Sequence, residues 1–182
     1  MPGIFCASAT SSRTVFAGNG SAQHLAGELF NLTAKTRIVH VPFKGGGQTA
    51  VAVASGEIEM AFATIPSVTP FVNSGRIRLL AITLPQRVSF LRDVPTLAES
   101  GLAGYEYSAW YGLMAPAATP PEILSRLQQE IGKAVNTAEM KEILNKGGLE
   151  PHTSTSREFA AFVKSQLERS RKLIKLAGIT AE

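Results

Sequence analysis

Short apolar runs alternate with glycine-rich turns and amphipathic helical stretches over the first half of the chain. Residues 14–17 are mostly apolar and end at Gly18-Asn19-Gly20-Ser21, which predicts a strand followed by a tight turn. Apolar positions then recur at helical spacing over residues 22–33, and Ser21 is a typical N-cap for that helix. The order is strand, glycine turn, helix.

The same order repeats twice more. A second predicted strand, residues 37–42, leads through a lysine and three glycines into a helix over residues 48–55. A third, residues 58–63, leads through a proline-containing turn into a helix over residues 67–74. Residues 77–83 are nearly all apolar, which predicts a strand buried on both faces. Strands separated by single short helices pair in parallel with right-handed crossovers.

Three loops, at residues 18–21, 44–49 and 64–67, follow strands and precede helices. In a parallel sheet such loops meet at the carboxyl edge, where ligands collect. The helix starts leave N–H groups without partners and carry a partial positive charge, which favours an anion. Lys44 precedes its glycines, so this is not a Walker-type phosphate loop, and a plain tight turn is the alternative interpretation.

The second half of the chain differs in character. Residues 105–115 form a predicted aromatic-rich strand, in which Trp110 and Tyr111 either line a binding site or pack in the core. Amphipathic helices follow, two of them opened by capping boxes at Thr119–Glu122 and Thr155–Glu158, with a short strand expected at residues 150–153. These helices have apolar stripes but no sheet of their own to cover.

Composition limits the classes of protein to which this chain can belong. The 182 residues carry a formal charge of +4, a mild excess that gives no reason to expect nucleic acid as a partner. The single cysteine excludes an intrachain disulfide, and Cys6, His24 and His40 have no metal-ligand spacing. No apolar run is long enough to span a membrane, and the first residues do not form a secretory signal, so the chain as written is expected in the cytoplasm.

Motifs for catalysis are missing. Ser21, His24 and Glu28 share one helix face, but a serine at an N-cap already engages its oxygen with the backbone. We therefore expect neither an enzyme nor a cofactor or metal site. The basic outer face of the last helix carries no interleaved aromatic residues, which is typical of a solvated face.

Four stretches carry a family resemblance: residues 16–30 (FAGNGSAQHLAGELF), 40–46 (HVPFKGG), 93–101 (DVPTLAESG) and 110–116 (WYGLMAP), the last running into Thr-Pro-Pro at 119–121. In this order they resemble the substrate-binding proteins of tripartite tricarboxylate transporters, the Bug or TctC family. The resemblance covers about residue 14 to the end.

The resemblance implies an α/β, type II periplasmic-binding-protein-like fold with a mainly parallel sheet. Residues 14–112 would be the second lobe of such a protein, and residues 113–182 the C-terminal helices of an incomplete first lobe. Residues 1–13 do not match the family and are expected to be a loose segment. Family members begin with a signal peptide and most of the first lobe, so the chain is expected to be a truncated member.

The function implied by the resemblance is that of a periplasmic receptor for a small carboxylated organic anion, which hands its solute to a membrane permease of two subunits. The loop at residues 44–50 corresponds to a carboxylate loop of the family, whereas Ala63 and Thr64 stand where many relatives have an aspartate. The candidate ligand-binding residues are Asn19, Gly20, Ser21, His24, Lys44, Gly45, Gly46, Gly47, Thr49, Ala50, Thr64, Pro66, Ser67 and Trp110.

Three other functions are alternatives on the sequence alone. An effector-sensing lobe of a transcription regulator would need a helix-turn-helix segment, and none is visible in the sequence. An anion-processing enzyme would need a general base near the glycine loops, where His24 is the one candidate. A fragment without function would expose its apolar stripes and aggregate.

Overall fold

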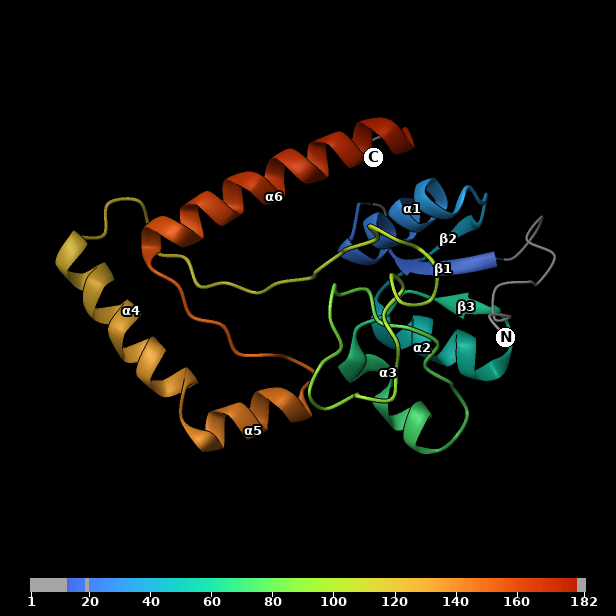
Figure 1. The fold of residues 1–182 in the computed structure, drawn as a ribbon, viewed down its shortest axis with the longest axis horizontal. Helices are drawn as coiled ribbons and strands as arrows, with labels where there is room; N and C mark the ends of the chain where they lie inside the picture. The colour runs from blue at the N-terminus through green and yellow to red at the C-terminus, as the bar shows by residue number, and fades with distance from the viewer. Residues whose placement is uncertain (1–12, 19, 180–182) are drawn as a thin grey trace. The chain divides into compact units, whose positions relative to one another are not determined.

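A computed structural model of the chain describes residues 13–18 and 20–179, apart from the side chains of residues 13–17. The described chain forms two compact units, one of residues up to Ala109 and from Lys172, the other of Trp110–Arg171. The elements, labelled in Figure 1, are β1 (Arg13–Ala17), α1 (Ala22–Ala34), β2 (Val39–Phe43), α2 (Gly46–Ser55), β3 (Met60–Ala61), α3 (Ile65–Asn73), α4 (Pro121–Val135), α5 (Ala138–Lys146) and α6 (Ser156–Ala177).

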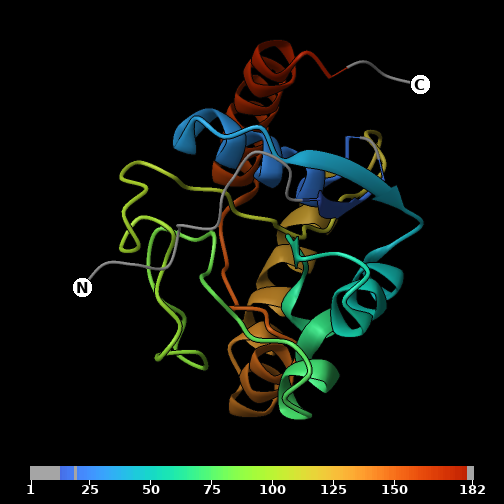
Figure 2. The same ribbon diagram turned by 90° about the vertical axis from the view of Figure 1, so that its right-hand side faces the viewer.

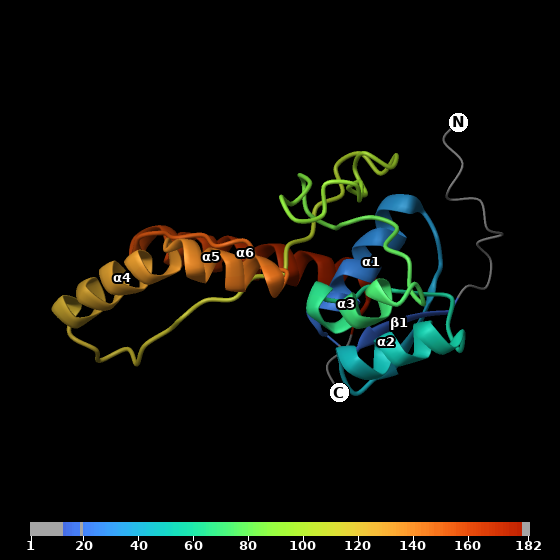
Figure 3. The same ribbon diagram turned by 90° about the horizontal axis from the view of Figure 1, so that it is seen from below.

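The first unit contains a parallel sheet in which β1 lies between β2 and β3. Thr14 aligns with His40 on one side and with Met60 on the other. The chain therefore moves from β1 to one neighbour through α1 and crosses back over β1 through α2. With right-handed crossovers, this reversal puts α1 and α2 on opposite faces of the sheet. Figures 1 and 3 show this placement, and Figure 2 shows α2 and α3 side by side.

Helix α1 follows from its two ends and its inner face. The Oγ of Ser21 accepts the His24 N–H at 3.2 Å, and Lys35 ends the helix in the left-handed conformation with φ at 55°. The buried side of the helix consists of His24, Leu25, Ala26, Gly27 and Phe30. The predicted helix over residues 22–33 is confirmed.

Asn31 ties the end of α1 to the start of β2. Its Oδ1 accepts the Ile38 N–H at 2.9 Å, and its Nδ2 donates to the Ile38 carbonyl at 3.2 Å. The Thr36 hydroxyl also donates to Oδ1, at 3.1 Å. One amide side chain thus satisfies both backbone groups of the residue before β2, which fixes where that strand enters the sheet.

The largest apolar cluster of the unit surrounds Tyr105, whose side chain is 1% exposed. The ring lies 6.4 Å from the Phe30 ring in an edge-on arrangement, and Leu97 belongs to the same cluster. The Tyr105 hydroxyl donates to the Ala26 carbonyl at 2.7 Å. Burial raises the pKa of this phenol above its usual range. Tyr105 therefore anchors a distant loop segment to α1.

Pro42 lies in β2, which is an edge strand among the described residues. The neighbouring Phe43 carbonyl accepts the Gly18 N–H from the loop after β1. Backbone groups of successive residues point to opposite sides of a strand, so the position of Pro42 faces away from β1. A proline there removes no hydrogen bond from the ladder.

Two strand predictions are wrong. Residues 77–83 form no strand in the described structure; only Ile82 bridges to Thr96, and Leu80 is 38% exposed. Residues 105–115 are also extended without a ladder, and Tyr111, Leu113 and Met114 are exposed. A short apolar run does not by itself distinguish a strand from an extended segment that packs on a core.

Smaller corrections concern boundaries. The strand expected at 58–63 is reduced to β3, and residues 150–153 contain no strand. The capping box at Thr119–Glu122 does not form, because α4 begins at Pro121 and Thr119 lies before its N-cap. The box at Thr155–Glu158 does form, with Thr155 Oγ1 accepting the Glu158 N–H and Glu158 Oε2 accepting the Thr155 N–H.

The second unit contains α4, α5 and most of α6. An aromatic group holds its first segment: the Trp110 ring lies 5.7 Å from Phe159 and 5.3 Å from Phe162, both edge-on. Gly112 touches the same group, since a Cβ there would lie 2.3 Å from Phe159 Cζ. No side chain of α4 or α5 is buried. None of the helices described is long and apolar enough to cross a membrane.

Replacing Tyr105 by phenylalanine removes the hydrogen bond to Ala26 and leaves the ring in place. We expect Tyr105→Phe to lower the free energy of unfolding by about 1 kcal/mol, measured by urea denaturation. Tyr111→Phe is the matched control, because the Tyr111 side chain is exposed. Equal stabilities of the two variants would contradict the anchoring role of the hydroxyl.

Candidate functional site

The three loops predicted to form a site lie at one edge of the sheet, because the strands they follow are parallel. The Gly18 N–H donates to the Phe43 carbonyl at 3.0 Å, which joins the loop after β1 to the end of β2. The starts of α2 and α3 also touch, since a Cβ on Gly46 would lie 3.3 Å from Cβ and Oγ of Ser67. This edge is also where the strand order reverses, the usual position of ligands in such sheets.

The start of α2 leaves backbone donors open. Its N-cap is Gly45, at φ 131°, a conformation that side chains rarely allow, and no side chain caps the helix. The N–H groups of Gly46, Gly47 and Gln48 find no acceptor among the described residues. The Lys44 N–H is bound separately by Gln48 Oε1 at 3.2 Å. The helix, which begins two residues before the predicted boundary, thus presents three N–H groups at its positive end.

Lys44 supplies the charge at this edge. It is the one formally charged residue in the loops 18–21, 44–49 and 64–67. Its side chain is exposed and forms no ion pair within the described chain. A lysine directly before the N-cap adds positive charge to a helix start with three open donors, which favours an anionic group and disfavours a cation.

The third loop is part of a helix. Because α3 begins at Ile65, Pro66 and Ser67 lie in its first turn, with Thr64 as N-cap. The Ser67 hydroxyl donates to the Thr64 carbonyl at 2.7 Å and accepts from the Thr64 hydroxyl at 3.3 Å. These two side chains are held against each other next to Gly46.

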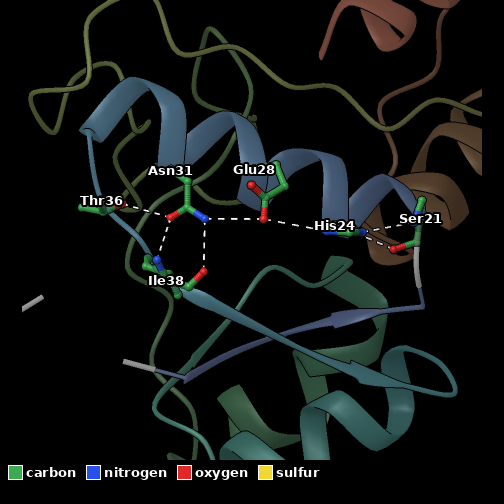
Figure 4. A network of polar contacts seen from close by, with 7 residues as sticks. Ser21, His24, Glu28, Asn31, Thr36 and Ile38 are labelled. Carbon is green, nitrogen blue, oxygen red and sulfur yellow. Dashed lines mark hydrogen bonds and ion pairs between the residues drawn. The ribbon is translucent and has the colours of Figure 1, made fainter. Parts of the chain in front are cut away.

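The start of α1 satisfies more of its donors than that of α2 does, although the N–H groups of Ala22 and Gln23 find no acceptor among the described residues. Gly20, at φ 72°, donates its N–H to His24 Nδ1 at 3.1 Å, while Ser21 caps the His24 N–H (Figure 4). Both candidate side chains, Ser21 and His24, are therefore occupied by backbone groups of their own turn. Of these two helix starts, that of α2 leaves more backbone donors open among the described residues, and a lysine directly precedes its N-cap.

Two predicted residues are buried within α2. Thr49 and Ala50 are 1% and 0% exposed, and the Thr49 hydroxyl donates to the Gly45 carbonyl at 3.2 Å. This bond supports the turn from inside. Their side chains hold the loop in shape and do not face solvent.

Two further predicted residues are not brought to this edge by the described structure. Asn19 lies outside the described residues. Trp110 belongs to the second unit, where it packs on Phe159 and Phe162. Their assignment to the ligand site stays a prediction.

Sequence reasoning missed two residues. His40 of β2 stacks on His24 with ring centroids 4.1 Å apart, and Gln48 binds the Lys44 N–H. A histidine within a strand carries no local signal for such a stack. Gln48 is the third residue of α2, the position from which a glutamine side chain reaches back to the helix start in a capping box, and this was an available signal.

The pKa values of both stacked histidines are lowered, chiefly by burial. For His24, burial lowers the pKa, while Glu28, whose Oε1 lies 3.8 Å from Nε2, opposes the shift. For His40, burial and the nearby His24 both lower the pKa. Both rings are therefore neutral at pH 7.

The contact between α2 and α3 can be tested with two glycines of the same helical turn. Gly47→Ala meets open space and should raise the free energy of unfolding by about 0.5–1 kcal/mol, as alanine loses less backbone entropy. Gly46→Ala should be less stable than Gly47→Ala, because its Cβ presses on Ser67. Thermal denaturation of both variants measures the difference, and Ser67→Gly should restore the Gly46→Ala variant. Identical stabilities would contradict the close approach.

Comparison with known proteins places the chain. Residues 12–179 match the model of the tripartite tricarboxylate transporter family receptor. A UPF0065 protein in the tcbD-tcbE intergenic region of Pseudomonas sp. (strain P51) is 33% identical over 159 residues, covering 87% of this chain and 47% of the relative.

Solved structures give the same result. The R. palustris protein Rpa4515 with adipate has a TM-score of 0.83 at 30% identity, covering 93% of this chain and 57% of that chain. MatC (Rpa3494) from Rhodopseudomonas palustris with bound malate has a TM-score of 0.75 at 27% identity, covering 92% of this chain and 58% of that chain. The periplasmic binding protein BugD has 0.79 at 25%, covering 94% and 58%.

The chain spans about half the length of the first curated relatives it matches. Its fold is that of periplasmic-binding-protein-like solute receptors. The family match extends over nearly all of the chain. The chain belongs to the family of tripartite tricarboxylate transporter receptors.

Proposed function

We propose that this chain provides a carboxylate-binding edge of an extracytoplasmic solute receptor. One observation carries the proposal: α2 starts with the open N–H groups of Gly46, Gly47 and Gln48, next to Lys44. Two backbone donors match the two oxygens of a carboxylate, and the third with the ammonium adds to the positive field. Two similar solved proteins hold adipate and malate, which supports a small dicarboxylate as ligand class.

The partner is proposed on the family description, which is that of a transporter receptor. The receptor would deliver its solute to a membrane permease from the periplasmic side. The similar protein BugD is described as a periplasmic binding protein, which supports this location. The family is one of binding receptors. We propose that the site binds without catalysis, because the His24 nitrogen that faces the loop already accepts the Gly20 N–H.

The ligand proposal is tested by isothermal titration calorimetry with adipate, malate, succinate, citrate, glutamate and terephthalate. At least one acid should bind, and Lys44→Gln should weaken it about two- to five-fold by removing one exposed charge. Gly45→Ala should weaken it further, since the backbone at φ 131° no longer suits the residue. Lys141→Gln, an exposed lysine on α5, is the matched control.

A spectrum of the backbone amides locates the bound acid. Titration should shift the amide signals of residues 46–48 and leave that of Gly75, beyond the end of α3, in place. Heat without shifts at residues 46–48 would place binding elsewhere. No heat with any of the six acids would contradict the proposed function for this chain.

We also propose that residues 14–112 are one lobe of the receptor and that residues 113–182 belong to the other. The support is the exposure of large apolar side chains in the second unit, including Leu113, Met114, Ile123, Leu127 and Ile143. Helices without a single buried side chain need a sheet to cover, and the relative from Pseudomonas sp. (strain P51) is about twice as long as this chain.

This assignment predicts that this chain associates with the remaining part of a receptor when that part is supplied separately. The first half of a full-length relative, expressed alone and mixed with this chain, should form a stable one-to-one complex in size-exclusion chromatography. A variant with Leu127→Glu should weaken the complex, because it puts a charge on the apolar face of α4. Failure of the unmodified chain to associate would contradict the lobe assignment.

A further inference from the structure

The contact between Gly20 and His24 defines the protonation state of the imidazole. The Gly20 N–H donates to His24 Nδ1 at 3.1 Å. A nitrogen that accepts a hydrogen bond carries no proton, so the neutral ring has its proton on Nε2. This tautomer is set by a backbone donor in the turn itself.

The other nitrogen meets a group that favours the same tautomer. Glu28 lies one turn further along α1, with its Oε1 3.8 Å from Nε2. The same oxygen lies 3.5 Å from Asn31 Nδ2, a donor that also binds the Ile38 carbonyl. A carboxylate facing Nε2 stabilises a proton there, and Asn31 holds the carboxylate in position (Figure 4).

Packing holds the ring in this orientation. His24 is 6% exposed, and its ring is stacked on His40 of β2 with an interplanar angle of 14°. Among the side chains that the structure describes, the titratable groups identified next to it are Glu28 from its own helix and His40 from the adjacent strand. The ring lies between them with one nitrogen toward the turn and the other toward Glu28.

We propose that His24 is a positioning residue, which holds Gly20 at the start of α1 through its unprotonated Nδ1 and does not contact the ligand. The turn is linked to the ligand edge, since Gly18 donates to the carbonyl of Phe43, directly before Lys44. This inference rests on the proposed carboxylate function for its consequence, whereas the contact itself can be tested without a ligand.

Protonation reverses the contact. With a proton on Nδ1, the ring presents a donor to the Gly20 donor, and the turn loses its support. Burial lowers the pKa of His24 in the folded state, so the support is complete above about pH 6.5 and is lost as the pH falls through the lowered pKa. Carboxylate affinity should therefore decrease on acidification over this range. A histidine in direct contact with the ligand would give the opposite sign, because an imidazolium attracts a carboxylate.

Two substitutions separate the roles of the ring. His24→Phe keeps the shape and the stack on His40 but offers no acceptor, and it should weaken the best acid of the panel about ten-fold at pH 7.5. His24→Asn places an oxygen where Nδ1 was and should recover most of this loss. On acidification from pH 7.5 the unmodified protein should lose affinity more steeply than His24→Asn, which keeps only the pH effects common to both proteins, such as protonation of the acid itself. His152→Asn, an exposed histidine, should leave the profile of the unmodified protein unchanged.

Nuclear magnetic resonance tests the contact without any acid. At pH 7.5 the long-range nitrogen spectrum of His24 should show an unprotonated Nδ1 and a protonated Nε2, and His24→Phe should shift the Gly20 amide signal more than His24→Asn does. A proton on Nδ1, or an unmoved Gly20 amide in His24→Phe, would overturn the proposal. So would an affinity that rises on acidification in the unmodified protein only. Absence of binding with an intact Gly20 contact would instead count against the carboxylate function alone.

Discussion

The parallel pairing of β1 with both β2 and β3 is the constraint on which the other features depend. It puts the carboxyl ends of the three strands at one edge, so that three helices begin there. The reversal of strand order sends α1 and α2 to opposite faces of the sheet. Their first turns therefore lie on opposite sides of the same edge. Nothing in the loops themselves would bring Gly18 to Phe43 or Gly46 to Ser67 without this pairing.

The starts of α1 and α2 differ in how their backbone N–H groups are satisfied. At the start of α1, His24 and Ser21 accept the N–H groups of Gly20 and His24, and Glu28 and Asn31 continue the polar contacts along the helix to Ile38. The start of α2 has glycine at its cap and three donors without acceptors in the described chain. The three donors of α2 belong to a formed helix, so at the proposed anion site they are in place before a ligand arrives.

The parts of the fold that sequence reasoning reached are those with local causes. Ser21 and Gly56 determine helix ends through their own hydrogen bonds and φ values, so α1 and α2 were predicted nearly to the residue. Residues 77–83 were predicted wrongly because their apolar pattern fits a strand as well as a segment lying on the Tyr105 cluster. The same limit applies to residues 105–115.

The candidate site divides along the same line. The glycine loops and Lys44 were found from the sequence, because their chemistry is local. The His24–His40 stack and the Asn31 contacts with Ile38 join residues that are brought together only by the fold.

The proline in β2 has a consequence for how the protein behaves at high concentration. Pro42 removes one N–H donor from the outer side of β2. A strand from another chain therefore pairs poorly with this edge, which disfavours self-association.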